Sequence, residues 1–239
     1  MIRFFFVVIF ILLFLIITLP LNLILYLIGK KNPDKRIAIS RKVIHWAFTC
    51  ILWINGADLT VDGQENIPEG AVLYVGNHRS LLDILATYVL IPGGVGYISK
   101  IELSRFPVFN QWMLGINCLF LDRENIREGL KTILKGVEEL KKGYSMFIFP
   151  EGTRSHSDEM LPFKEGSTKM AEKAKVPIVP VAITGTADLF ENNRTCCMKA
   201  AKVHVSFGKP IIISELAKEE KKFLGSYTQN IIAEMLKRC

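Results

Sequence analysis

A long uncharged segment at the amino terminus constrains what this chain can fold into. Residues 4–29 hold 26 consecutive positions without a charged side chain, FFFVVIFILLFLIITLPLNLILYLIG. About 20 apolar residues are enough for a helix that spans a membrane. The segment exceeds the ~7 to 15 apolar residues of a secretory signal, and no small-x-small cleavage motif follows it. We therefore expect a retained membrane anchor rather than a cleaved signal.

A second apolar stretch predicts that the anchor has two helices. Residues 43–56, VIHWAFTCILWING, are 14 uncharged positions, a length that favours an interfacial or partly inserted helix. Pro20 is expected to kink or break the first segment, because proline removes a helix hydrogen bond. The basic segment 30–42, KKNPDKRIAISRK, is expected to form the turn and to rest on anionic headgroups, with about 1 kcal/mol from each charge.

This pattern divides the chain into an anchor over residues 1–56 and a second domain over residues 57–239. The positive-inside rule predicts that the protein is membrane-associated with its second domain on the cytoplasmic side. An ordinary single span with the same domain behind it is the alternative, and it gives the same orientation.

The composition also bears on partners and on metal sites. The formal net charge is +7 and half of the residues are hydrophobic, yet the chain has no recognition-helix, RNA-binding or zinc-finger signature. We therefore expect a bilayer with anionic lipids as a partner, and no nucleic acid. The five cysteines show no C-x-x-C spacing, which predicts neither a disulfide framework nor a zinc site, as fits a reducing compartment.

Short apolar runs alternate with amphipathic stretches beyond the anchor. The expected strands cover residues 71–75, 95–99, 117–122, 145–150, 177–183 and 202–207. The clearest helix is predicted over residues 125–142, where apolar residues recur at helical spacing behind a capping box of Asn125 and Glu128. The tail from residue 214 is also expected to be helical. Strands crossed by helices predict an α/β domain with a mostly parallel sheet flanked by helices.

The stretch GNHRSLLDI, residues 76–84, places a histidine between a predicted strand and a predicted helix. Ligands of open α/β sheets bind beyond the carboxyl ends of strands, where His78 lies. If Ser80 caps the helix, Asp83 falls on its first turn and can return toward His78. A carboxylate on Nδ1 would fix the tautomer and leave Nε2 as a base. The pair is a candidate for general-base catalysis, and a structural histidine is the alternative.

Further polar residues follow other predicted strands. In FPEGTRS, residues 149–155, a glycine permits a tight turn and Arg154 offers a planar fork of donors suited to phosphate. An anion site or a surface pair of Glu151 with Arg154 would each explain this motif. Asp122 and Arg123 end the run LFLDRE, Lys100 follows another strand, and Pro180 is expected to break the strand in VPIVPVAITG.

Other site chemistries lack their motifs in this sequence. The chain contains no G-x-S-x-G nucleophile elbow, no H-E-x-x-H and no set of spaced metal ligands, so we expect no metal and no cofactor. A base without a protein nucleophile predicts direct attack by a bound hydroxyl group.

The four motifs NHRSLLD, LFLDRE, FPEGTRS and VPIVPV, in this order, resemble those of the glycerolipid acyltransferase family, specifically its 1-acylglycerol-3-phosphate acyltransferase branch. The resemblance spans roughly residues 58–210, and the apolar amino terminus is similar to the two-helix anchor of bacterial members. It implies transfer of an acyl chain from acyl-coenzyme A or acyl-carrier protein to the sn-2 hydroxyl of lysophosphatidate, which gives phosphatidate.

The resemblance also implies roles for single residues. His78 would be the general base and Asp83 the carboxylate that orients it. The acceptor site would be shaped by Glu151, Gly152, Thr153 and Arg154, with the phosphate on Arg154, support from Asp122 and Arg123, and a contribution from Lys100. Pro180 would serve either the architecture of the site or the packing of the acyl donor.

Several alternatives stay open at the level of sequence. The acceptor could be another lysophospholipid, glycerol 3-phosphate or a lyso-aminolipid, and water could replace it in a hydrolase. A lipid-binding protein without catalysis could also use this fold.

Overall fold

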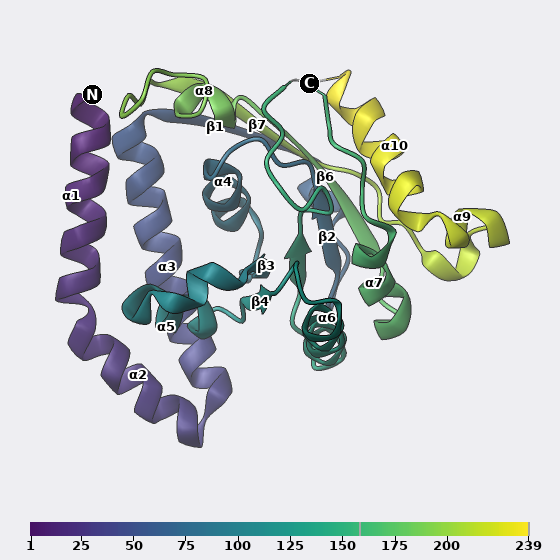
Figure 1. The fold of residues 1–239 in the computed structure, drawn as a ribbon, viewed down its shortest axis with the longest axis horizontal. Coiled ribbons are helices and arrows are strands. Elements are labelled where there is room, and N and C mark those ends of the chain that lie inside the picture. The colour runs from purple at the N-terminus through teal and green to yellow at the C-terminus, as the bar shows by residue number, and fades with distance from the viewer. Residues whose placement is uncertain (158, 239) are drawn as a thin grey trace.

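Helices and strands alternate along most of the chain in the computed structural model, which describes residues 1–157 and 159–238 (Figure 1). The helices are α1 (Ile2–Ile17), α2 (Leu19–Lys31), α3 (Pro33–Asn55), α4 (Leu82–Leu90), α5 (Pro107–Gly115), α6 (Ile126–Lys141), α7 (Lys169–Ala174), α8 (Thr186–Leu189), α9 (Lys218–Lys222) and α10 (Leu224–Leu236). The strands are β1 (Ala57–Asp62), β2 (Leu73–Gly76), β3 (Gly96–Lys100), β4 (Leu119–Leu121), β5 (Met146–Ile148), β6 (Ile178–Thr184) and β7 (Ala201–Phe207).

The strands form one sheet in the order β1-β7-β6-β2-β5-β3-β4. Neighbouring strands run parallel except β6 and β7, which are antiparallel. The predicted α/β domain with a mostly parallel sheet is therefore confirmed. Each of the six predicted strands is present, and β1 is an additional one. β1 begins directly after Gly56, the residue in left-handed conformation that ends α3. Because no loop separates the apolar helix from the strand, the sequence pattern did not indicate a separate strand here.

Helices cover both faces of the sheet, as parallel sheets require. Figure 1 shows α6, α7 and α10 on one face, and α4 and α5 on the other with α1 to α3 outside them. Two clusters of buried apolar side chains correspond to these faces. The larger cluster includes Val7, Leu25, Ile44 and Ile51 from the amino-terminal helices together with residues of the sheet. Residues 1–56 thus share a hydrophobic core with the rest of the chain.

The predicted anchor, residues 1–56, contains three helices where the sequence predicted two. The first apolar segment bends by 52° between α1 and α2, as expected from Pro20, which has no N–H to donate within the first turn of α2. The prediction of a basic turn over residues 30–42 was wrong. Asn32 accepts a hydrogen bond from Lys35 N and Pro33 occupies the first helical position, so α3 begins there and carries most of this segment.

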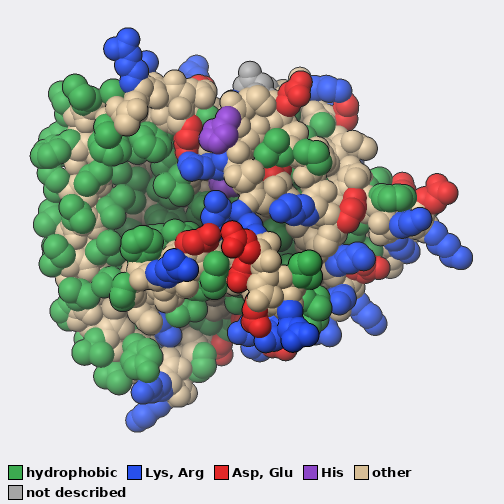
Figure 2. Space-filling model, viewed as in Figure 1, with side chains coloured by type: hydrophobic (Ala, Val, Ile, Leu, Met, Phe, Trp, Pro, Cys, Tyr) green, Lys and Arg blue, Asp and Glu red, His purple; other side chains and the backbone are tan. Residues whose placement is uncertain are grey.

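The amino-terminal helices present an apolar outer face. Exposed side chains include Phe5 and Leu12 of α1, Leu23 of α2 and Trp53 of α3, and Figure 2 shows apolar side chains gathered over this part of the surface. Among the described residues, α3 is long and apolar enough to cross a membrane, and the bent pair of α1 and α2 would add a second segment if it is one span. Exposed apolar patches of this kind occur at membrane and protein–protein interaction sites.

Two local predictions require correction. β6 continues through Pro180, which was predicted to break it. On the β7 side of the strand, the regular ladder ends at Val181, and the next pairing is an isolated bridge from Ile178 to Ile211. Pro180 lies between them, so its missing N–H removes no hydrogen bond of the regular ladder. The apolar stripe of α6 is buried only toward its end, at Val137 and Leu140. Ile126, Leu130 and Leu134 are exposed, because the three-residue edge strand β4 offers little sheet beneath the first turns.

We expect Ile51→Ala to lower the free energy of unfolding by about 2 to 5 kcal/mol, because it leaves a cavity where α3 packs on the domain. Denaturant unfolding of the detergent-solubilised protein would measure this loss. Trp53→Ala is the control, since this side chain of the same helix is 80% exposed and its removal should change stability by less than about 0.5 kcal/mol. Equal losses in both variants would contradict the packing described here.

Candidate active site

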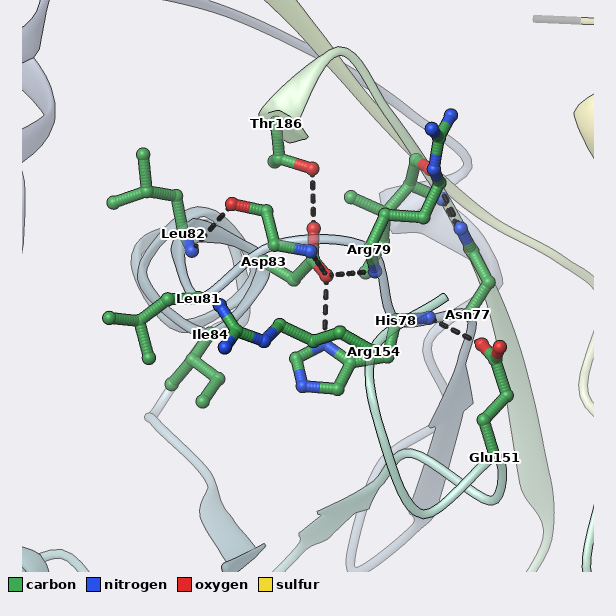
Figure 3. Close-up of polar contacts among 12 residues, drawn as sticks. Asn77, His78, Arg79, Leu81, Leu82, Asp83, Ile84, Glu151, Arg154 and Thr186 are labelled. Carbon is green, nitrogen blue, oxygen red and sulfur yellow. Dashed lines mark hydrogen bonds and ion pairs between the residues drawn. The ribbon is translucent and has the colours of Figure 1, made fainter. Parts of the chain in front are cut away.

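His78 and Asp83 lie at the carboxyl end of the central strand β2. The chain leaves the sheet after Gly76 and enters α4 at Leu82, and the Oγ of Ser80 accepts a hydrogen bond from Leu82 N at the start of this helix. Asp83 therefore falls on the first turn, and its Oδ2 is 2.9 Å from His78 Nδ1. The contact predicted from the spacing of these two residues is present (Figure 3).

The Asp83 carboxylate is fully buried and accepts hydrogen bonds at both oxygens. The backbone N–H groups of Arg79 and Ser80 each donate to Oδ2 over 2.8 Å, beside the imidazole. Thr186, which follows β6, donates its hydroxyl to Oδ1. These donors hold the carboxylate in one orientation, and a carboxylate that accepts from Nδ1 leaves the lone pair of the imidazole on Nε2.

The FPEGTRS loop, which follows β5, is tied to His78 through the backbone. His78 N donates to Glu151 Oε1 over 2.6 Å, and Ser155 N donates to the His78 carbonyl over 2.8 Å. The imidazole stacks on Phe149, with 4.1 Å between ring centroids. Burial raises the pKa of Glu151, and the N–H groups of Leu161 and His78 oppose that rise. The loop therefore fixes both the backbone and the ring of His78.

Arg154 reaches the same corner and meets Glu191. Its Nη1 donates to Glu191 Oε1 over 2.7 Å, and the same oxygen accepts from Leu81 N. The other carboxylate oxygen accepts from Ser80 Oγ over 2.6 Å. The alternative interpretation of a surface pair between Arg154 and Glu151 does not hold, because Arg154 pairs with Glu191. The Arg154 side chain is 41% exposed, and its guanidinium has further donors for an anion.

The remaining predicted site residues follow three different strands, β5, β3 and β4, at the same edge of the sheet. Gly152 has φ of +76° and makes the tight turn that its motif predicted, and Thr153 is exposed beside it. Lys100 ends β3 and is exposed, one strand beyond β5. Asp122 follows the edge strand β4 and accepts from the N–H groups of Glu124 and Asn125 before α6, while Arg123 lies near Glu102. Their described contacts therefore belong to the β4 end of the sheet.

Sequence reasoning missed Thr186 and Glu191. Both follow β6, so the rule that sites lie beyond the carboxyl ends of strands could have indicated Thr186, which stands two residues after that strand. Glu191 comes after the short helix α8, and no local motif marks it.

Three segments that are distant in the sequence thus meet around the pair of His78 and Asp83. Its Nδ1 is held by a buried carboxylate, and a half-exposed guanidinium lies beside the loop that carries it. This arrangement can remove a proton from an alcohol and bind an anionic group near it. In the described part of the chain, no cluster of three or more metal-binding side chains is found.

Comparison with known proteins identifies relatives over most of the chain. The Acyltransferase family model matches residues 58–184, which is more than half of it. The 1-acyl-sn-glycerol-3-phosphate acyltransferase of Saccharomyces cerevisiae is 33% identical over 189 residues, covering 76% of this chain and 59% of that protein. The probable 1-acyl-sn-glycerol-3-phosphate acyltransferase of Mycoplasma pneumoniae is 33% identical over 219 residues, covering 84% of this chain and 82% of that protein.

A solved structure is similar over nearly the full length. The crystal structure of the 1-acyl-sn-glycerophosphate acyltransferase PlsC from Thermotoga maritima superposes with a TM-score of 0.72 at 27% identity, and covers 93% of this chain and 96% of that chain. The chain spans about three fifths of the length of the yeast relative and of a coconut relative with the same name. On the match of the family model and of these relatives, the chain belongs to the Acyltransferase family.

Proposed function

We propose that this protein transfers an acyl chain from acyl-coenzyme A or acyl-carrier protein to the sn-2 hydroxyl of 1-acylglycerol 3-phosphate, which forms phosphatidate. The names of its relatives support this reaction. The observation that carries the proposal is the buried Asp83 carboxylate, which orients His78 at the carboxyl end of β2.

In the proposed reaction, Nε2 of His78 accepts the proton of the acceptor hydroxyl as its oxygen attacks the thioester carbonyl. The tetrahedral intermediate collapses, the carbon–sulfur bond breaks, and the thiolate leaves. Asp83 keeps the Nδ1 proton in place and stabilises the imidazolium that forms. The residues of this chain supply base and orientation, and we assign no cofactor or metal a part in the reaction.

Arg154 is proposed to bind the phosphate of the acceptor. Its exposed guanidinium can form a bidentate pair with a phosphate, and Glu191 holds it beside the His78 loop. Lys100 is proposed to share the anion, while Gly152, Thr153 and Glu151 shape the loop. Asp122 and Arg123 would support this edge of the sheet from β4.

The apolar face of α1 to α3 supports a reaction at the bilayer, where the lysolipid and its product both reside. We propose that this face embeds the protein in the membrane with its active site on the cytoplasmic side, at headgroup depth. Two basic residues in the last turn of α2, Lys30 and Lys31, fit anionic headgroups there.

We expect His78→Ala to lower kcat/KM by about 10² to 10⁴ without loss of folded protein, because the acceptor then loses its base. The measurement uses membranes that carry the protein, a labelled acyl thioester and lysophosphatidate. His204→Gln is the control, since His204 bonds to Thr60 and Asp62 of β1. Full activity of His78→Ala would rule out this mechanism.

Arg154→Ala should raise the apparent KM for a phosphate-bearing acceptor about tenfold or more, because it removes a charge-assisted hydrogen bond to the phosphate. Arg154→Lys should recover part of the loss. Steady-state kinetics with lysophosphatidate would measure the rise in apparent KM. The same assay with lysophosphatidylcholine as a competing acceptor would measure the preference for a terminal phosphate. Unchanged kinetics would place Arg154 outside the acceptor site.

Glu191→Gln should raise the same KM, because Arg154 loses the carboxylate that holds it. A double-mutant cycle with Arg154→Ala tests this dependence. We expect the double variant to resemble Arg154→Ala alone. Additive losses would mean that Glu191 acts independently of Arg154.

A further inference from the structure

A second cationic hollow lies at the far end of α4 from His78. It has a volume of about 680 Å³ and is lined by residues 38–45 of α3, by Gln64 and by the turn that follows α4. We call it the α3 pocket. Because α4 begins beside His78 and is nine residues long, roughly 12 Å of helix separates the pocket from the candidate active site.

The charges that line the α3 pocket are of one sign. Arg41 and Lys42 are adjacent on α3 and carry these charges. None of the described residues that line the pocket is acidic. The pocket therefore favours an anionic ligand.

Arg41 is held in place but has donors to spare. Its Nη1 donates to the carbonyl of Gly93 over 2.8 Å, and its guanidinium lies over the Tyr144 ring. Its Nε and Nη2 are buried and have no partner among the described residues. These two N–H groups form one edge of the guanidinium, which is the edge that binds two phosphate oxygens side by side.

Tyr88 supplies a second donor of the same kind. The residue is 1% exposed, it lines the α3 pocket, and its hydroxyl has no hydrogen-bond partner in the described part of the chain. Leaving a buried polar group unpaired costs about 1 to 3 kcal/mol. A ligand that accepts from both Arg41 and Tyr88 would recover this loss.

The surroundings of the pocket indicate where such an anion comes from. Lys42 lies one turn before Trp46, which is 57% exposed and contacts Phe10 of α1. Trp53 follows two turns later and is 80% exposed. Exposed tryptophans on an apolar face lie at headgroup depth in membranes. A phosphate in the α3 pocket would thus have apolar surface beside it for acyl chains.

We infer that the α3 pocket binds the phosphate of an anionic membrane phospholipid, separately from the acceptor at His78. The lipid phosphate pairs with the free edge of Arg41, with Lys42 and with the Tyr88 hydroxyl, and the acyl chains lie along the apolar face that carries Trp46. This contact ties α3 to one class of lipid rather than to the bilayer in general.

The experiment uses the full chain in nanodiscs of phosphatidylcholine and phosphatidylglycerol, followed by native mass spectrometry of the lipids retained by the protein. Phosphatidylglycerol is the probe because it is neither substrate nor product of the proposed reaction. Arg41→Gln should reduce its retention about tenfold, as expected for loss of a charge-assisted pair, and Lys42→Gln should reduce it several-fold.

Lys35→Gln is the matched control, because it removes the same charge from an exposed position of α3 outside the pocket. We expect it to retain phosphatidylglycerol as the unmodified chain does. Equal losses in Lys35→Gln and Lys42→Gln would overturn the inference in favour of diffuse attraction, and so would unchanged retention in both pocket variants. If circular dichroism shows that Arg41→Gln does not fold, retention of phosphatidylglycerol by Lys42→Gln decides the result, because Lys42 is exposed and its replacement should not disturb the fold.

Inorganic phosphate distinguishes a lipid from a soluble ligand. Phosphate binding is first titrated on the protein in detergent, which gives the concentration that saturates any phosphate site. If the pocket binds a lipid, the protein in nanodiscs should still retain phosphatidylglycerol at that phosphate concentration. Binding of phosphate by the unmodified chain but not by Lys42→Gln, together with no retained phosphatidylglycerol, would overturn the lipid assignment. Acyl transfer assayed on the same variants separates this result from the proposed function, which depends on His78.

Discussion

The arrangement of this site depends on one buried side chain, the carboxylate of Asp83. It is fully shielded from water, which would be costly for an isolated charge. Its cost is offset because two backbone N–H groups, a hydroxyl and an imidazole donate to it. The backbone donors belong to the loop before α4, and the hydroxyl belongs to Thr186, the first residue of α8. The carboxylate therefore joins this loop to the start of α8 while it orients His78.

A second carboxylate, that of Glu191, performs a similar task at the rim. It accepts from Ser80 and Leu81 at the start of α4 and from Arg154 of the FPEGTRS loop. Glu151 adds the tie between that loop and His78 N. These contacts hold Arg154 and His78 in a constant relation although the two residues follow different strands. Preorganisation of this kind is what acyl transfer requires, since the protein needs no reorganisation as charge develops.

Local patterns predicted most of the fold and the central pair of the site. Strands of apolar residues, the helix cap at Asn125 and the short return from His78 to Asp83 depend on neighbours in the sequence. Glu191 could not be predicted, because its contacts join residues about 110 positions apart. The helical start of α3 was missed for a different reason: the charges of residues 30–42 suggested a turn, but Asn32 and Pro33 favour a helix. The exposure of Leu130 and Leu134 depends on the short edge strand β4, which periodicity within α6 does not reveal.

The shared core of the amino-terminal helices and the sheet has a consequence for how this chain reaches its native state. Val7, Leu25 and Ile51 belong to the same buried cluster as Tyr88 and Phe147. The position of these helices and the stability of the sheet are therefore coupled. A lipid or detergent that draws α1 to α3 away from α4 would act as a denaturant of the acyltransferase domain, and one that matches their outer face would act as a stabilising ligand.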